Sequence, residues 1–175
     1  MNEQTNQFII TFENIITIYK ETASILNDAE ALLEEKNFSC SHGNTGGTEQ
    51  SKRMDLPQRW VTPYIARYFI NDNNPFKKYS MGIFFLDKSF SPIEPLIICA
   101  IFNIKKNENE DPIEKYDYWY LKEAWYTIAK GDKCEKVYDF GDCWNAESGK
   151  IFARKLLDVK GQTEIQETVE RLLSL

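Results

Sequence analysis

The residues suited to metal binding or nucleophilic chemistry are few in this chain. Cys40, His42, Cys134 and Cys143 supply three thiols and the single histidine, which is the ligand count of a structural zinc site. Such ligands usually come as two close pairs, each with about two to four intervening residues. Here the first pair has one intervening residue and the second has eight. The spacing therefore predicts reduced, unlinked thiols and no bound metal or cofactor, and these four residues are the candidate ligands if a zinc ion does bind.

A cysteine nucleophile would need His42 as its base, because the chain has one histidine. His42 lies in the polar, glycine-rich segment SHGNTGG, with no carboxylate close in sequence to orient its ring. Cys99 lies in an apolar run, where a thiol usually packs rather than reacts. We therefore expect a solvated His42 and assign no catalytic residue. An enzyme or small-ligand site between the predicted sheet and residues 40–53 is the alternative.

A metal-dependent nuclease core would need an aspartate and an acidic-x-Lys triplet on adjoining strands. The carboxylates would hold Mg²⁺, and the lysine would help to polarise the attacking water. Asp87 follows the first predicted strand, but the second strand offers Asn103-Ile104-Lys105, with an amide in place of the carboxylate. Glu114 could substitute only from a distance. A degenerate nuclease-like core is therefore the least favoured interpretation.

Aromatic residues concentrate in one short segment, residues 116–126. On a strand, Tyr116, Tyr118 and Tyr120 would share one side, while Trp119 and Trp125 would share the other. Tyr and Trp combine large apolar area with a polar group, and they are enriched at interface hot spots. These five residues are the predicted partner-binding site if the tyrosine row faces outward beside the acidic residues 108–114. The alternative is that helices cover both rows.

The elements that would position these residues begin with a long helix over residues 8–36. Its apolar positions alternate in steps of four and three, which places them in one stripe. Ile9, Ile16 and Ala23 widen the stripe, which favours packing against a sheet of the same chain. A two-helix dimer is the alternative, but fewer than four uninterrupted heptads are present. The stripe consists of Phe8, Phe12, Ile15, Tyr19, Thr22, Leu26, Ala29 and Leu33.

Two apolar runs, residues 79–86 and 96–104, predict the centre of a sheet. They are rich in β-branched and aromatic residues, and their near-continuous apolarity indicates strands that are covered on both faces. The proline-bounded connection between them fits a hairpin with a long turn. Residues 116–128 predict a third strand, and residues 59–70 predict a short helix with Pro63 in its first turn.

A C-terminal helix is predicted after Gly161, because Thr163 and Gln166 form a capping-box pattern. Residues 151–157 fit either a further helix or an edge strand, and the sequence does not decide between them. The apolar face of the C-terminal helix would consist of Ile165, Val169, Leu172 and Leu173.

The composition of the chain predicts a globular α+β fold. It has 175 residues, of which 42% are hydrophobic, 27% charged and 14% aromatic. We expect a single domain over residues 1–175, with an antiparallel sheet of about three or more strands, a long N-terminal helix and a C-terminal helix. A flexible polar loop is expected at about residues 37–56. Neither a membrane-spanning run of about 18–20 apolar residues nor a signal-peptide pattern occurs, which predicts a cytoplasmic location without membrane contact.

The charge balance argues against nucleic acid as the partner. There are 21 Lys+Arg against 27 Asp+Glu, and the basic residues cluster only in pairs within polar stretches. An acidic protein instead attracts basic proteins, because complementary charge steers association. The sequence therefore predicts a noncatalytic cytosolic interaction protein, such as an acidic inhibitor or immunity-type protein, that binds a basic partner. It leaves the oligomeric state open.

Overall fold

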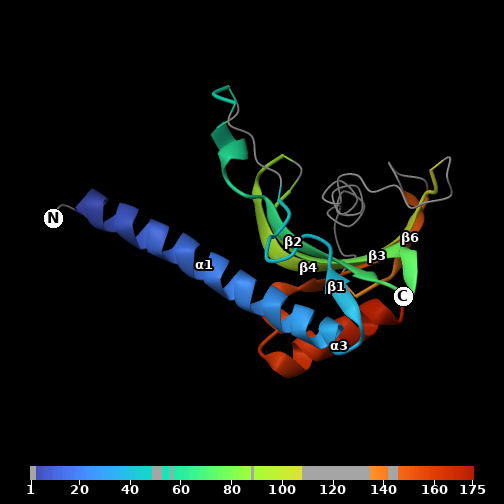
Figure 1. The fold of residues 1–175 in the computed structure, drawn as a ribbon. Coiled ribbons are helices and arrows are strands. Elements are labelled where there is room, and N and C mark those ends of the chain that lie inside the picture. The colour runs from blue at the N-terminus through green and yellow to red at the C-terminus, as the bar shows by residue number, and fades with distance from the viewer. Residues whose placement is uncertain (1–2, 49–52, 56, 88, 108–134, 142–145) are drawn as a thin grey trace.

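Two α-helices and one antiparallel sheet make up the part of the chain that the computed structural model describes, namely residues 3–48, 53–55, 57–87, 89–107, 135–141 and 146–175. The predicted α+β fold, with a long N-terminal helix and a C-terminal helix, is confirmed (Figure 1). The helices are α1 (Glu3–Glu34) and α3 (Gln162–Leu173), and the strands are β1 (Phe38–Cys40), β2 (Tyr64–Asn71), β3 (Asn74–Leu86), β4 (Pro92–Ile104), β5 (Tyr138–Phe140) and β6 (Ala146–Lys155).

The sheet has the strand order β1-β2-β3-β4-β6-β5, and every neighbouring pair is antiparallel. Its centre is the predicted hairpin of β3 and β4, whose strands are each 13 residues long. Asp87 closes this hairpin, because its Oδ1 accepts hydrogen bonds from the backbone N–H groups of Ser89 and Ser91 at 2.7 and 2.9 Å. A tight turn joins β2 to β3, where the Asn73 N–H donates to Asn71 Oδ1 at 2.9 Å.

Both faces of the sheet are buried, as the continuous apolar runs predict. Successive side chains of a strand point to opposite faces. One face carries Tyr64, Tyr68, Phe84, Ile98 and Phe102. The opposite face lies under the two helices, which pack on each other and on the sheet. Its core comprises Phe69, Met81, Ile83, Ile97, Cys99, Ile101 and Phe152 from the sheet, Leu26, Ala29 and Leu33 from α1, and Ile165, Val169 and Leu172 from α3.

The predicted helix over residues 59–70 is wrong. Residues Pro57–Trp60 form a single 3₁₀ turn, and Tyr64–Asn71 form strand β2. Because both faces of β2 are buried, apolar residues occupy consecutive positions and hide the two-residue period of a strand. Pro63 precedes the strand rather than opening a helix, and its carbonyl oxygen accepts a hydrogen bond from the N–H of Phe85 at 2.9 Å.

The structure decides the open choice for residues 151–157 and corrects the predicted helix cap. Residues 146–155 form strand β6, but this is not an edge strand, because it lies between β4 and β5. A 3₁₀ turn follows at Leu156–Asp158. The capping box is wrong, since the N-cap of α3 is Gly161 and no side chain caps it. Gln166 donates instead to Glu170 one turn later, at 2.9 Å. The apolar face of the helix is confirmed, with Ile165, Val169 and Leu172 buried and Leu173 half-buried.

Candidate interaction surface on helix α1

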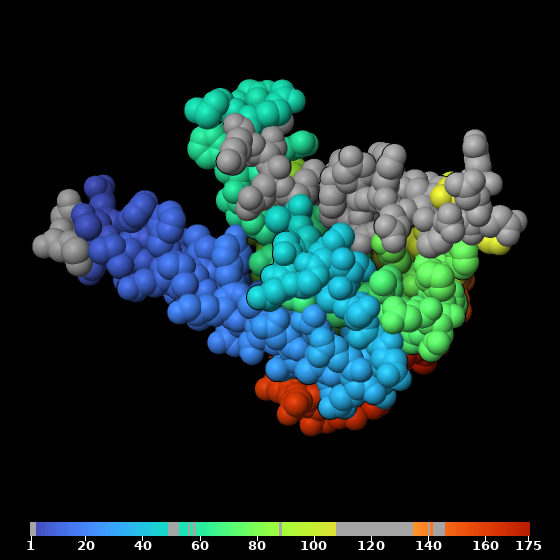
Figure 2. All heavy atoms as spheres, viewed as in Figure 1, coloured from blue at the N-terminus to red at the C-terminus, as the bar shows by residue number. Residues whose placement is uncertain are grey.

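Helix α1 passes through two environments along its 32 residues. Its C-terminal half lies against β1 and α3, and there Thr22, Leu26, Ala29 and Leu33 are buried. Its N-terminal half extends past the edge of the sheet (Figure 1). In Figure 2 this half of the helix extends away from the rest of the molecule. We call residues 3–18 the projecting half of α1.

The projecting half exposes large apolar side chains to solvent. Phe8 is 64% exposed and Phe12 51% exposed, and five isoleucines are between 37% and 51% exposed. The interpretation that the whole stripe packs within the chain is therefore wrong for this half. The four-three spacing specifies which side of the helix is apolar, but it does not specify how far the sheet extends beneath it. The seven exposed residues are Phe8, Ile9, Ile10, Phe12, Ile15, Ile16 and Ile18.

The exposed apolar side chains of the projecting half contact one another, and few charged residues lie among them. The rings of Phe8 and Phe12 pack with their centroids 4.7 Å apart. Tyr19 marks the boundary of this surface, because the ring of Tyr19 lies 6.3 Å from that of Phe85, near the end of β3. Glu3 and Glu13 are the only charged side chains among residues 1–19. Such a surface complements another apolar surface better than a charged one.

A buried ion pair fixes α1 to the sheet below the projecting half. Arg67 of β2, only 5% exposed, donates to Glu30 Oε1 at 2.5 Å and to the carbonyl oxygen of Gly43 at 2.9 Å. Its Nε also donates to the Sγ of Cys40 at 3.2 Å. Neither Arg67 nor Glu30 was predicted from the sequence as part of a site. A signal was available, because Glu30 falls on the apolar side of the helix, where a carboxylate needs a cation.

The predicted metal candidates are only partly placed. Cys40 lies on β1, and His42 is exposed with its ring edge-on to Tyr68 at 6.1 Å. Cys134 and Cys143 lie outside the described residues. Within the described ranges, no three His, Cys, Asp or Glu side chains gather closely enough to hold a metal ion. Burial raises the pKa of the Cys99 thiol far above its ordinary value, so little of the reactive thiolate forms at neutral pH.

The polar segment after β1 contacts β2 again at Gly46 and Gly47. Gly47 and Ala66 form a short antiparallel bridge, with N···O distances of 2.7 and 2.9 Å in the two directions. Gly46 packs so closely that a Cβ there would lie 2.9 Å from Ile65 Cγ2. These contacts occupy the outer side of β2, where a ligand site between the sheet and residues 40–53 would have to form.

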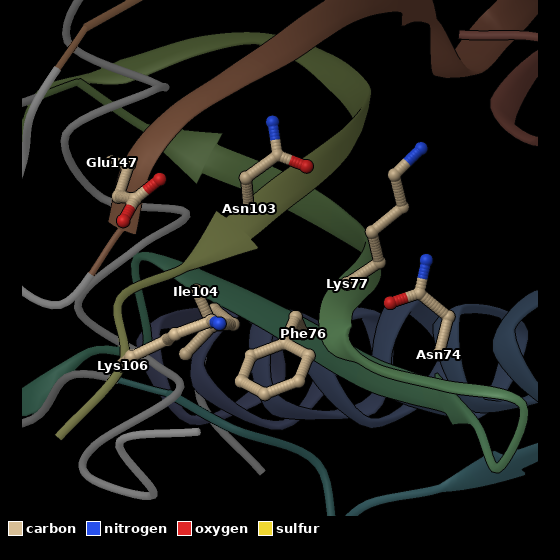
Figure 3. A pocket seen from close by; sticks show the side chains of 7 residues that line it. All are labelled: Asn74, Phe76, Lys77, Asn103, Ile104, Lys106 and Glu147. Carbon is tan, nitrogen blue, oxygen red and sulfur yellow. The ribbon is translucent and has the colours of Figure 1, made fainter. Parts of the chain in front are cut away.

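A polar hollow of about 370 Å³ opens at the far end of the β3–β4 hairpin (Figure 3). In the figure, Asn74 and Lys77 lie on one side of it and Lys106 and Glu147 on the other. Asn103 donates to Ser148 Oγ at 2.8 Å. The lining residues are Asn74, Phe76, Lys77, Asn103, Ile104, Lys106 and Glu147.

The residues considered for a nuclease core do not meet in this hollow. Asn103 pairs with Lys77, whereas Leu86, next to Asp87, pairs with Pro92. Asp87 and the Asn103 triplet therefore lie at opposite ends of the hairpin. Glu114 lies outside the described residues. Among the described residues, Glu147 is the one carboxylate that lines the hollow, so the described lining does not provide the set of acidic ligands that a catalytic Mg²⁺ usually takes.

The five predicted partner-binding residues, Tyr116, Tyr118, Trp119, Tyr120 and Trp125, lie outside the described residues, as does the predicted third strand. Comparisons with protein-family models, with curated proteins and with solved structures find no match to this chain. In the described part of the chain, no helix has the length and apolarity needed to cross a bilayer.

Proposed function

We propose that this chain is a noncatalytic, cytosolic protein-interaction module. The observation that carries the proposal is the projecting half of α1, where seven large apolar side chains stand in solvent. Single exposed apolar residues are ordinary, but six of these seven, all except Ile10, share one side of the helix. A contiguous apolar surface of this kind usually marks a contact with another macromolecule. The helix is positioned for such a contact, because the buried Arg67–Glu30 pair and the core anchor its other half.

The proposed partner is a basic protein that is recognised through the aromatic segment, residues 116–125. The net charge of −6 supports this choice, since complementary charge accelerates association and suppresses wrong partners. Tyr118, Trp119 and Tyr120 are the proposed central contacts, flanked by Tyr116 and Trp125. An acidic inhibitor of a basic enzyme or toxin is one protein of this type. The contacts of Gly46 and Gly47 with β2 give no support to the ligand-binding alternative.

The experiment that tests this function is quantitative capture of host proteins on the immobilised full-length chain. Wild type is compared with the triple variant Tyr118→Ala/Trp119→Ala/Tyr120→Ala. The matched control is Trp60→Ala, which removes an aromatic side chain that is 48% exposed elsewhere on the surface. We expect wild type and the control to retain one or a few basic proteins. We expect the triple variant to retain at least tenfold less, and high salt to weaken the capture.

Two outcomes would overturn the proposal. One is capture of only those proteins that the bare matrix also retains. The other is a captured protein whose retention is the same for the wild type and the triple variant. Circular dichroism of each variant establishes that a lost contact does not reflect a lost fold.

A further inference from the structure

We propose that the projecting half of α1 is a homodimer contact in which two copies of this chain pack their stripes antiparallel. The inference deepens the proposed function by naming a second copy as the occupant of this one surface. The basic partner would still bind to the aromatic segment, residues 116–125. The two proposals therefore stand or fall in different experiments.

The charges of the helix favour a protein over a lipid surface as the occupant. Amphipathic helices that lie on membranes carry Lys and Arg on their polar face, where these residues meet anionic head groups. The first basic residue of this chain is Lys20, at the boundary of the projecting half, and Glu3 and Glu13 precede it. Two such helices also oppose few like charges when they pair.

The spacing of the stripe fits an antiparallel pair of helices. In such a pair, Phe8 would lie in one layer with Tyr19 of the second copy, and Phe12 would lie in one layer with Ile15 of the second copy. The two-fold axis repeats both layers, which gives four layers over residues 8–19. Ile9 and Ile16 then flank the layers on one side and Ile18 on the other.

The direction of the pairing follows from where the stripe becomes buried. From Thr22 onward the same side of the helix faces the core of its own chain, through Leu26 and Leu33. A parallel partner on this side would bring its own folded body to the same place. An antiparallel partner places the two bodies at opposite ends of the helix pair. The fold therefore admits the antiparallel pair and obstructs the parallel one.

The size of the contact predicts a reversible dimer. Six of the exposed side chains on each copy, all except Ile10, lie on the paired side of the helix, and they are between 37% and 64% exposed. Covering these six on both copies removes on the order of 1,000 Å² in total from solvent. That area lies near the lower limit of specific interfaces. We expect monomer and dimer to exchange at micromolar concentrations.

The test is sedimentation velocity of the full chain over a concentration series, with wild type, Phe12→Asn and Ile10→Asn. The two substituted side chains are each 51% exposed on the same helix. Ile10, however, lies about 160° around the helix from Phe12, away from the stripe. We expect wild type and Ile10→Asn to dimerise alike, and we expect Phe12→Asn to raise the dissociation constant at least tenfold.

The direction is tested by disulfide formation between two tagged variants, Phe8→Cys and Tyr19→Cys. We expect mild oxidation to cross-link the mixture of the two, and each variant alone no more than wild type, whose native cysteines set the background. Self-cross-linking of Phe8→Cys would overturn the antiparallel arrangement.

Three results would overturn the dimer itself. The first is that wild type sediments as a monomer at every concentration, and the second is that Phe12→Asn and Ile10→Asn raise the dissociation constant equally. The third is that wild type floats with phosphatidylcholine or phosphatidylglycerol vesicles and Phe12→Asn does not. The last result would assign the surface to a membrane. A monomer that still captures a basic protein through the aromatic segment would refute the dimer and leave the proposed function intact.

Discussion

The Arg67 guanidinium is a charge that the fold encloses almost completely, and its partner is on another element. Removing the carboxylate in Glu30→Ala leaves that charge buried without its counter-ion. We expect a loss of about 3 kcal/mol in the free energy of unfolding. The double variant Glu30→Leu/Arg67→Met removes both charges, and we expect it to recover most of this loss. Urea denaturation measures both.

The matched control for this prediction is the exposed ion pair of Arg53 and Asp55, whose side chains are 64% and 62% exposed. The Arg53 guanidinium lowers the pKa of the Asp55 carboxyl, so any stabilisation is present above the ordinary carboxyl pKa and is lost as the pH falls. Water screens this pair, and we expect Asp55→Asn to leave the denaturation midpoint unchanged at neutral pH. Equal effects of Glu30→Ala and Asp55→Asn would contradict the role of burial.

Cys99 and Cys40 should differ in reactivity towards alkylating agents. Cys99 is fully buried, and this burial raises its thiol pKa, so the thiolate that reacts is scarce and inaccessible. Cys40 is half-buried at the edge of the sheet. We expect iodoacetamide to modify Cys40 in the native protein and Cys99 only after unfolding, as peptide mass spectrometry would show. Equal labelling of both in the native state would contradict the core position of Cys99.

At the scale of the element, α1 combines a core helix and a surface helix in one unbroken segment. Leu26 and Phe12 occupy equivalent positions of the same stripe, but Leu26 is 2% exposed and Phe12 is 51% exposed. We expect Leu26→Ala to lower the free energy of unfolding by about 3 kcal/mol. We expect Phe12→Ala to change it by less than about 0.5 kcal/mol.

Chemical denaturation at a concentration low enough to keep the chain monomeric measures both values. Such a concentration separates the stability of the fold from any association of the projecting half. A loss for Phe12→Ala that equals the loss for Leu26→Ala would show that the N-terminal half packs on its own chain after all.

The sequence predicts an element correctly when one of its faces is apolar and the other polar. It does not when both faces are apolar. The stripe of α1 and the apolar face of α3 were predictable because polar residues mark the opposite sides. The β3–β4 hairpin was predictable from its composition. Strand β2 was not, because apolar residues fill both of its faces and Pro63 suggested the start of a helix. The position of Glu30 on the apolar side of α1 signals that it needs a cation, but no local pattern specifies Arg67, which lies 37 positions away.

At the scale of the whole molecule, the sequence predicts that helices pack on a sheet, but it does not predict how far the sheet extends beneath helix α1. Burial of both faces of the sheet followed from the composition of its strands. The sheet covers only the C-terminal half of α1, and this depends on strand lengths and register that the helix sequence does not contain. The extent of the projecting half therefore follows from the folded structure, and the helix sequence alone does not specify it.

The short outer strands of the sheet affect how the protein behaves when it is crowded. The long strands β2, β3, β4 and β6 lie inside the described sheet, while β1 and β5, at its two edges, are three residues each. The bridge from Gly47 to Ala66 occupies further backbone groups of β2 beyond β1. At both edges of the described sheet a neighbouring chain thus meets a strand of only three residues. The longest strands of the described sheet, β3 and β4, are already paired on both sides, so the protein can expose an adhesive helix at high concentration without offering these two strands as templates for fibrous aggregates.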